Sequence, residues 1–505
     1  MKKRDRKIVS KRKKKIAARL DRENNDFGGK PVFQARNMDY EMSDRITGTT
    51  RGGVGAIHTM LHRLDFSTEI NDALRLLKIH NPYFESDHIL NLAYNVLTGG
   101  TRIEDIESLR QDAGYMDAIG AGRIPDPTTA GDFLRRFSEP QIEILMTTIN
   151  KIRQKVWEEC AKGDPSFYDE AILEVDGTLT ETLGECKHGM DISYKGVWGY
   201  APLIVTLANT REVLFIVNRP GNTPSAKDAA KWINRSIALL QGRFRRIVVR
   251  GDTDFSLTAY MDQWDEDGVR FVFGYDATPN LQAHAEGLSE ARWEEFLRKE
   301  KYSVKTRSRA RPHNVKEEIV RRRKFENQRL LCEDIQEFEY SPVKCDKTYR
   351  MVVIRKNISV EKGEHVMFEE FRYFFYITND WTTPARDIVY EANQRCDQEN
   401  IIGQLKSGIN ALRMPVDNLL SNWAYMVVAS LAWNFKAWYG LLIPDDADSR
   451  EVVRMEYKKF LVNFIQIPTQ ILRTGRRIVY RILGYNSYLP TFFDTFARIR
   501  RTKFG

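Results

Sequence analysis

Three acidic residues occupy positions at which they could hold metal ions. Asp176 ends the apolar run "AILEVDG", and Asp252 ends a second apolar run, "RRIVVRGD". If the two runs are neighbouring strands of an open α/β sheet, both carboxylates lie at the carboxyl ends of the strands, where functional groups gather. Adjacent carboxylates repel each other, and a divalent cation that prefers oxygen ligands, magnesium or manganese, would relieve the repulsion.

A third carboxylate, supplied by a helix, would complete a site for two metal ions. Glu399 in "YEANQRCDQENIIGQLKSG", 390–408, is the candidate. Two ions clamp the attacking and leaving oxygens of a phosphodiester during an in-line displacement. Arg395 and Lys406 fall on the same face of the expected helix as Glu399 and could hold flanking phosphates.

Each of these signals also has a simpler interpretation. An aspartate after a strand often begins a turn, and "DG" at 176–177 is a common turn pair. Arg395 and Glu399, spaced i,i+4, could form an ion pair on a solvated helix. Asp254 competes with Asp252 for the second acidic position, although Asp252 follows its strand directly. We favour metal chemistry because three acids in this order, each on a suitable element, are hard to attribute to turns.

The elements that would position these acids form an α/β pattern in the middle of the chain. Residues 165–275 predict the order β-β-β-α-β-α-β, with apolar strands bounded by polar turns. Residues 276–371 break this alternation with a charged, irregular stretch and then strand-like runs, which indicates a partly β insertion. The pattern resumes at 372–415 with an apolar strand and the helix that carries Glu399.

Helical patterns flank this core on both sides. Residues 41–164 have apolar residues three and four apart, which predicts a helical domain, and 416–505 predict a helical, basic region. The position of 41–164 next to a basic arm suggests that this domain binds DNA. Residues 1–40 are expected to be a basic, flexible arm, because the first 22 are rich in lysine and arginine. Further candidates for phosphate contact are Arg135, Arg136 and Arg250.

The composition favours a DNA-binding protein of a reducing compartment. The chain has 505 residues, a net charge of +9 and a pI of about 9.1, which suit a polyanionic partner. Its five cysteines include no CxxC pair, which argues against a zinc ribbon or a disulfide scaffold. We expect no signal peptide and no membrane span: the most apolar run, 419–443, contains Asn422, Asn434 and Lys436 and predicts a buried helix.

Three segments resemble the catalytic blocks of a known enzyme family. "EVDGT", "VVRGDTDFS" and "RCDQENIIGQLK" are similar to the three blocks of the DDE transposases of bacterial insertion sequences. The resemblance is to cut-and-paste members with a β-rich insertion, insertion sequence family 1380 and the related family 4, and the spacing of Arg395, Glu399 and Lys406 matches their signature. Two positions depart from it: Asp254 stands where the family has glycine, and Ala392 where it has tyrosine.

The resemblance implies a fold, a chemistry and partners. It implies a ribonuclease-H-like core in which Asp176, Asp252 and Glu399 are the catalytic residues and hold two Mg²⁺ or Mn²⁺ ions. It implies double-stranded DNA as partner, both the terminal inverted repeats and the target, with a homodimer in the synaptic complex. It also implies a location in the bacterial cytoplasm with the nucleoid. DNA hairpins with a flipped base stacked on an aromatic residue are part of the resemblance, and Trp293 and Trp198 are candidates for that residue.

Two alternative functions remain. A domesticated relative would act as a nuclease with the same chemistry but without integration, and its gene would lack flanking inverted repeats. A non-enzymatic derivative would bind DNA without cutting it, and the presence of all three acids, Asp176, Asp252 and Glu399, argues against this alternative.

Overall fold

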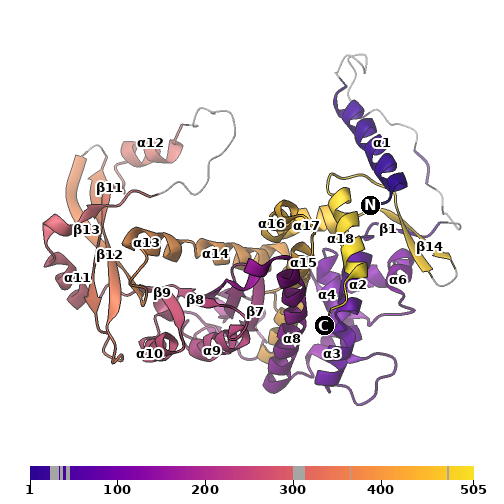
Figure 1. Cartoon of the computed structure of the whole chain (residues 1–505), viewed down its shortest axis with the longest axis horizontal. Coiled ribbons are helices and arrows are strands. Elements are labelled where there is room, and N and C mark those ends of the chain that lie inside the picture. The colour runs from indigo at the N-terminus through magenta and orange to yellow at the C-terminus, as the bar shows by residue number, and fades with distance from the viewer. Residues whose placement is uncertain are drawn as a thin grey trace. The chain divides into compact units, whose positions relative to one another are not determined.

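The computed structural model contains two compact units (Figure 1). It describes residues 1–22, 33, 38–40, 42, 46–298, 313–363, 365–474 and 477–504. The sheet unit combines Asp169–Gly177 with Pro224–Glu399, and the helical unit combines Met1–Tyr168, Thr178–Thr223 and Asn400–Gly505. Asp176, Asp252 and Glu399 all belong to the sheet unit.

A mixed β-sheet forms the centre of the sheet unit. Its strands lie in the order β10-β11-β12-β13-β9-β8-β2, and β2 (Glu170–Gly177), β8 (Arg246–Gly251) and β9 (Val269–Tyr275) are parallel neighbours. Most of the apolar side chains of these three strands are buried, as is typical of parallel strands covered on both faces. Figure 1 shows α9 (Ala229–Leu240) and α10 (Thr258–Glu266) on one side of the strands, with α13 (Ala385–Asn393) on the other. The carboxyl ends of β2, β8 and β9 therefore meet at one edge.

The predicted insertion continues the same sheet. Its antiparallel strands are β10 (Glu294–Glu295), β11 (Glu326–Tyr340), β12 (Tyr349–Lys362) and β13 (His365–Thr378), and the helices are α11 (Pro279–Glu286) and α12 (Val315–Arg322). The last four residues of β13 pair with β9. The expected boundary between 371 and 372 therefore falls inside one continuous strand.

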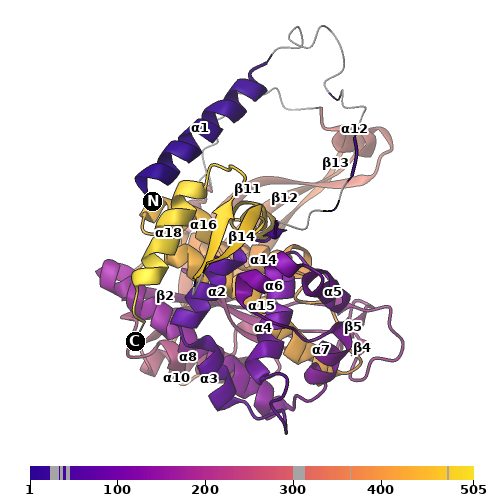
Figure 2. The ribbon, with the colours of Figure 1, turned by 90° about the vertical axis from the view of Figure 1, so that its right-hand side faces the viewer.

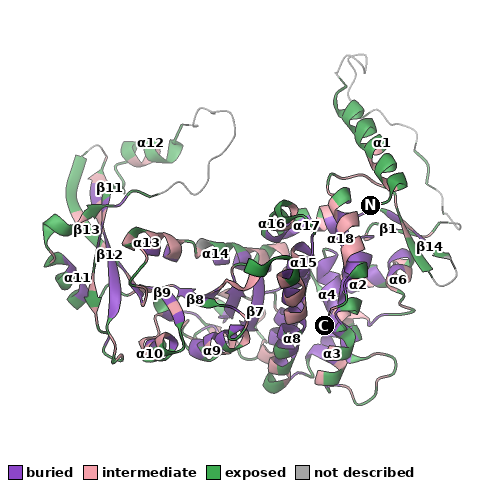
Figure 3. Cartoon of the chain, in the orientation of Figure 1, coloured by how far each residue is buried: buried purple, intermediate pink, exposed green. Residues whose placement is uncertain are grey.

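Helices dominate the helical unit. They are α1 (Lys3–Leu20), α2 (Val54–Arg63), α3 (Phe66–Ala73), α4 (Glu85–Leu97), α5 (Ile106–Arg110), α6 (Ala113–Ile119), α7 (Pro127–Leu134), α8 (Glu139–Gly163), α15 (Leu419–Leu441), α16 (Asp446–Arg454), α17 (Tyr457–Phe460) and α18 (Leu489–Arg501). The run expected to be a buried helix is α15, which is buried along almost its whole length and packs on α4, α8 and β7 (Glu212–Val217) (Figure 3). Within the described residues, no helix has the length and apolarity that crossing a membrane requires.

The fold is mixed α/β with a large mixed sheet, as the sequence predicted. The elements β2, β6 (Leu203–Leu207), β7, α9, β8, α10 and β9 follow the expected order along the chain. Strands β6 and β7 are antiparallel, whereas β2, β8 and β9 are parallel, which is the pattern of a ribonuclease-H-like core.

Both ends of the chain differ from the sequence expectation. Helix α1 replaces a flexible arm over 3–20, because lysine, arginine and alanine favour helix and because Arg12 donates hydrogen bonds to the carbonyls of Ile482 and Gly484. Figure 2 shows α1 beside α18. The rest of the expected arm lies largely outside the described residues. The C-terminal region contains a hairpin of β14 (Thr469–Thr474) and β15 (Arg477–Ile482), joined by β1 (Gly48–Thr49), where a helix was expected.

Candidate active site

Asp176 and Asp252 lie at the ends of adjacent parallel strands. Asp176 is the penultimate residue of β2, and Asp252 directly follows β8. Both side chains are partly buried. Burial, and then repulsion by Asp252, raise the pKa of Asp176 to about 6. The two carboxylates are therefore close enough to disfavour each other's charged form.

The structure favours Asp252 over Asp254 as the partner of Asp176. Asp252 Oδ1 accepts a hydrogen bond of 3.1 Å from the amide of Asp254, and Oδ2 lies 3.5 Å from Nη1 of Arg395. Burial raises the pKa of Asp252, and the charge of Arg395 opposes the rise. The side chain of Asp254 is exposed.

Arg395 connects the second acid with the third. Its Nη2 lies 3.9 Å from Oε1 of Glu399, while its Nη1 reaches Asp252. The charges of Arg395 and Glu399 both act on the pKa of Asp176, in opposite directions. The structure thus brings Asp176, Asp252, Glu399 and Arg395 together within the sheet unit.

The single helix expected over 390–408 is broken. Helix α13 ends at Asn393, Gln394 and Arg395 form a turn, and α14 (Cys396–Gly403) carries Glu399. A π-helix follows over Gln404–Gly408 and contains Lys406. The expectation of one continuous helix is therefore wrong, although Arg395 and Glu399 remain neighbours, 3.9 Å apart. Lys406 belongs to the helical unit, where it lines a cavity of about 660 Å³ together with Arg102 and Arg413.

Arg250 is buried, which corrects its assignment as a DNA contact. Its side chain is 3% exposed and forms an ion pair of 2.6 Å with Glu174, whose side chain is fully buried. Its Nη1 donates to the carbonyl oxygen of Glu391 and to Oε1 of Gln394. These contacts position α13 on the sheet. Of the other candidates, Arg135 is exposed and paired with Asp132 and Asp417, and Arg136 is exposed.

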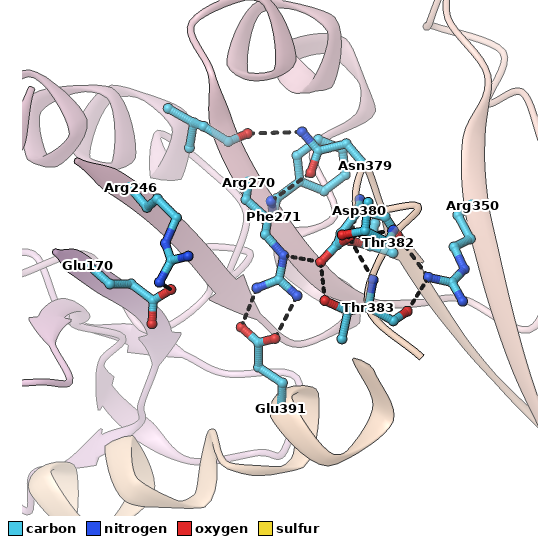
Figure 4. Close-up of polar contacts among 12 residues, drawn as sticks. Glu170, Arg246, Arg270, Phe271, Arg350, Asn379, Asp380, Thr382, Thr383 and Glu391 are labelled. Carbon is cyan, nitrogen blue, oxygen red and sulfur yellow. Dashed lines mark hydrogen bonds and ion pairs between the residues drawn. The ribbon is translucent and has the colours of Figure 1, made fainter. Parts of the chain in front are cut away.

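A second arginine that the sequence did not single out also holds α13 (Figure 4). Arg270 of β9 donates to both carboxylate oxygens of Glu391, at 2.7 and 2.6 Å, and its Nε donates to Asp380 at 2.7 Å. Hydrogen bonds from Thr383 and Thr382 outweigh the effect of burial and lower the pKa of Asp380 well below its usual range. Asp380 is thus a charged anchor for Arg270.

A fourth acid lies near the site. Asp276 directly follows β9, the third of the parallel strands, and its charge contributes to the raised pKa of Asp252. Its side chain is exposed. The signal that identified Asp176 and Asp252, an aspartate at the end of an apolar strand, applies equally to Asp276 and was overlooked in "VRFVFGYD".

The types of side chain at this site suit a divalent cation, but their positions in this structure do not form a closed metal site. Carboxylate oxygens are the ligands that Mg²⁺ and Mn²⁺ prefer. The pKa of Asp176 is raised first by burial and then by repulsion from Asp252. Among the described residues, however, no three His, Cys, Asp or Glu side chains are grouped closely enough to hold a metal ion. The guanidinium of Arg395 supplies the positive charge between Asp252 and Glu399. The carboxylates that could hold a metal are Asp176, Asp252 and Glu399, with Arg395 between the last two.

The two candidate tryptophans have different surroundings. Trp293 is partly buried, and the guanidinium of Arg355 lies 4.4 Å from its ring centroid. Trp198, in β5 (Trp198–Tyr200), is 52% exposed. Stacking on a flipped base stays a prediction for both residues.

Comparison with known proteins identifies the family. The model of the transposase DDE domain, group 1, matches residues 44–504. No curated protein matches the sequence. Among solved structures, one similar chain is piggyBac transposase, in a cryo-EM structure of its synaptic complex with hairpin DNA; it is 12% identical, the match covers 84% of this chain and 88% of that chain, and the TM-score is 0.32. The family match does not specify insertion sequence family 1380. Because it spans almost the whole sequence, the chain belongs to the DDE transposase family.

Proposed function

We propose that this protein cleaves and joins DNA at the ends of an insertion sequence, with Asp176, Asp252 and Glu399 as the catalytic residues and Mg²⁺ or Mn²⁺ as cofactor, two ions in each site. The observation that carries the proposal is the placement of Asp176 and Asp252 at the carboxyl ends of neighbouring parallel strands, with Arg395 between Asp252 and Glu399. Carboxylates brought together in this way are typical of sites that bind cations.

The three acids and Arg395 have different roles in the proposed reaction. Bound metal ions would lower the pKa of the attacking water and stabilise the leaving oxygen. Asp176 and Asp252 hold their oxygens at a fixed edge of the sheet, and Glu399 approaches from α14. Arg395 compensates their charge before metal binds and afterwards holds a phosphate oxygen of the DNA. The 3′-hydroxyl released by the first cleavage then attacks a second phosphodiester.

The proposed partner is double-stranded DNA, both the terminal inverted repeats and the target. Arg136, Lys406 and the basic side chains of α1 other than Arg12 are exposed and would contact phosphates. By its resemblance to cut-and-paste transposases, the protein would act as a homodimer in a synaptic complex, pass through hairpin intermediates and work in the cytoplasm, at the nucleoid.

A cleavage assay tests this proposal. The substrate is a duplex containing the DNA that borders the gene, incubated with Mg²⁺. We expect Asp176→Asn, Asp252→Asn and Glu399→Gln each to lower the cleavage rate by about 10³-fold or more while DNA binding persists. Asp254→Asn is the matched control and should cleave like the wild type. Wild-type cleavage by any of the three variants would remove that residue from the site.

The same assay separates the alternative functions. Nicking without strand transfer would identify a domesticated nuclease. DNA binding that needs no metal, with no nicking in Mg²⁺ or Mn²⁺, would identify a non-enzymatic derivative.

A further inference from the structure

We propose that Arg250 is a positioning residue that sets the location of Glu399 relative to Asp176 and Asp252. This inference rests on the proposed function of those three acids. It assigns to Arg250 a role in catalysis that is exerted through α13 and the turn that leads into α14, without contact to DNA or metal.

The guanidinium of Arg250, on β8, joins β2 to the end of α13 and to the turn that follows it. Arg250 lies two residues before Asp252 on β8, and Glu174 lies two residues before Asp176 on β2, so each is on the same face of its strand as the acid that follows. The parallel register places Glu174 opposite Arg250. The ion pair of these two buried side chains thus comes two residues before the aspartate on each of the two strands.

The other side of the guanidinium reaches the helix. Nη1 of Arg250 donates to the carbonyl oxygen of Glu391 at 3.1 Å and to Oε1 of Gln394 at 3.2 Å. Gln394 is the first residue of the turn between α13 and α14, and the next residue is Arg395. Arg250 thus fixes the chain at the point from which the helix of Glu399 begins.

Glu399 depends on this support because its side chain is weakly held within the described part of the chain. The side chain is 57% exposed, and its ion pair with Arg395 is long, at 3.9 Å. Helix α13, by contrast, has two polar contacts with the sheet at Glu391. Arg250 donates to the carbonyl oxygen of Glu391, and Arg270 donates to its carboxylate (Figure 4). A displacement of about 1 Å at a catalytic group can cost about 100-fold in rate, so a loosened turn is expected to be visible in catalysis.

The chain supplies a matched control for Arg250. Arg246 and Glu170 form a second pair across β2 and β8, in register, at the opposite ends of the same two strands (Figure 4). Their side chains are 3.4 Å apart; that of Arg246 is 70% exposed and that of Glu170 34%. Arg246 belongs to none of the contacts of α13 described above. If Arg250 only stabilised the pairing of the strands, replacing Arg250 and replacing Arg246 would lower the stability of the protein by different amounts. Neither replacement would then affect the position of Glu399 more than the other.

The test uses Gln394, whose side chain is exposed and whose replacement does not threaten the fold. Gln394→Met removes the acceptor for Arg250, whereas Gln394→Glu keeps it. Arg250→Met and Arg246→Met are made in parallel. Each full-length variant is measured for the rate of cleavage of gene-bordering DNA in Mn²⁺, for DNA affinity, and for hydrogen exchange of 396–403 in the metal-free protein.

We expect Gln394→Met to lower kcat by about 10- to 100-fold at unchanged DNA affinity and to speed exchange in 396–403. The cleavage rates of Gln394→Glu and Arg246→Met should stay within about 3-fold of the wild-type rate, a much smaller change than a misplaced catalytic group is expected to cause. The proposal is overturned if Gln394→Met exchanges and cleaves like the wild type, if Gln394→Glu fails equally, or if Arg246→Met matches Arg250→Met. Should Arg250→Met not fold, the Gln394 pair decides.

Hydrogen exchange separates this proposal from the proposed function. A wild-type protein that cleaves no DNA refutes the function, and faster exchange in Gln394→Met would then still support the positioning contact. A wild-type protein that cleaves, with an unaffected Gln394→Met, refutes the positioning role alone.

Discussion

Replacing Asp176 by asparagine should stabilise the metal-free protein while abolishing cleavage. The pKa of Asp176 rises from an ordinary 3.8 to about 6, chiefly through burial and through repulsion by Asp252. At 1.36 kcal/mol per pKa unit, this rise corresponds to about 3 kcal/mol of unfavourable free energy for the charged carboxylate in the folded state at pH 7. Asparagine removes that charge, so Asp176→Asn should raise the free energy of unfolding by up to about 3 kcal/mol at pH 7.

The sign of the pH dependence follows from the same shift. The folded protein binds the proton of Asp176 more tightly than the unfolded chain does, so wild-type stability falls as the pH rises from about 4 to about 6. Below about pH 4 the carboxyl is protonated in both states, and the difference between Asp176→Asn and the wild type should vanish.

Urea unfolding of the metal-free protein between pH 4 and pH 8, followed by circular dichroism, measures this difference. Asp254→Asn, which changes an exposed carboxylate two residues from Asp252, is the control for a general effect of net charge. Mg²⁺ should stabilise the wild type more than Asp176→Asn, because the variant lacks one of the proposed ligands. A variant that is less stable than the wild type at pH 7, or a difference independent of pH, would refute the reasoning.

Three further changes have expected outcomes. Arg395→Gln removes the cation beside Asp252 and Glu399, so urea unfolding should show lower stability at pH 7, with a larger recovery on adding Mg²⁺ than the wild type has. Deleting residues 1–21, which contain α1, should weaken DNA binding and flatten the dependence of log K on log salt concentration, as fluorescence anisotropy would measure. Burial lowers the pKa of Lys436, whose ammonium donates to the carbonyl of Val453; Lys436→Met should therefore raise stability by about 1–2 kcal/mol at pH 7, and by less at pH 9, in urea unfolding. For Arg395→Gln, a recovery on adding Mg²⁺ equal to that of the wild type would contradict the expectation. For the deletion, an unchanged salt slope would do so, and for Lys436→Met, a loss of stability.

The strand-end acids could be predicted because their signal is local. A parallel strand buried on both faces is a short apolar run that ends at a polar residue. For Asp176 and Asp252, the apolar run and the acid that ends it can both be read within a few residues of sequence. The order of strands and helices then limits which strand ends can be neighbours. The same logic would have found Asp276 had it been applied to the end of β9.

The role of Arg250 could not be predicted in this way. An arginine beside a catalytic motif in a basic protein is readily interpreted as a phosphate contact, and nothing local distinguishes it from a buried arginine. Its partner Glu174 is 76 residues away in sequence and Gln394 is 144 residues away. Tertiary folding brings these side chains together: the parallel register of β2 and β8 pairs Arg250 with Glu174, and the packing of α13 on the sheet brings Gln394 to Arg250.

The break between α13 and α14 was hidden for a related reason. Gln394 and Arg395 are good helix formers, so intrinsic propensity predicts a continuous helix. The turn coincides with the point at which Gln394 accepts a hydrogen bond from Arg250 and Arg395 reaches Asp252. Tertiary contacts therefore override the local preference where the site is built.

Binding of Mn²⁺ to the purified protein, followed by electron paramagnetic resonance, addresses the proposed metal site without a DNA substrate. With two ions held by three carboxylates, the wild type should bind two Mn²⁺ per chain, and Asp176→Asn, Asp252→Asn and Glu399→Gln should each bind fewer or bind them much more weakly. Wild-type Mn²⁺ binding by all three variants would show that these acids do not form a metal site.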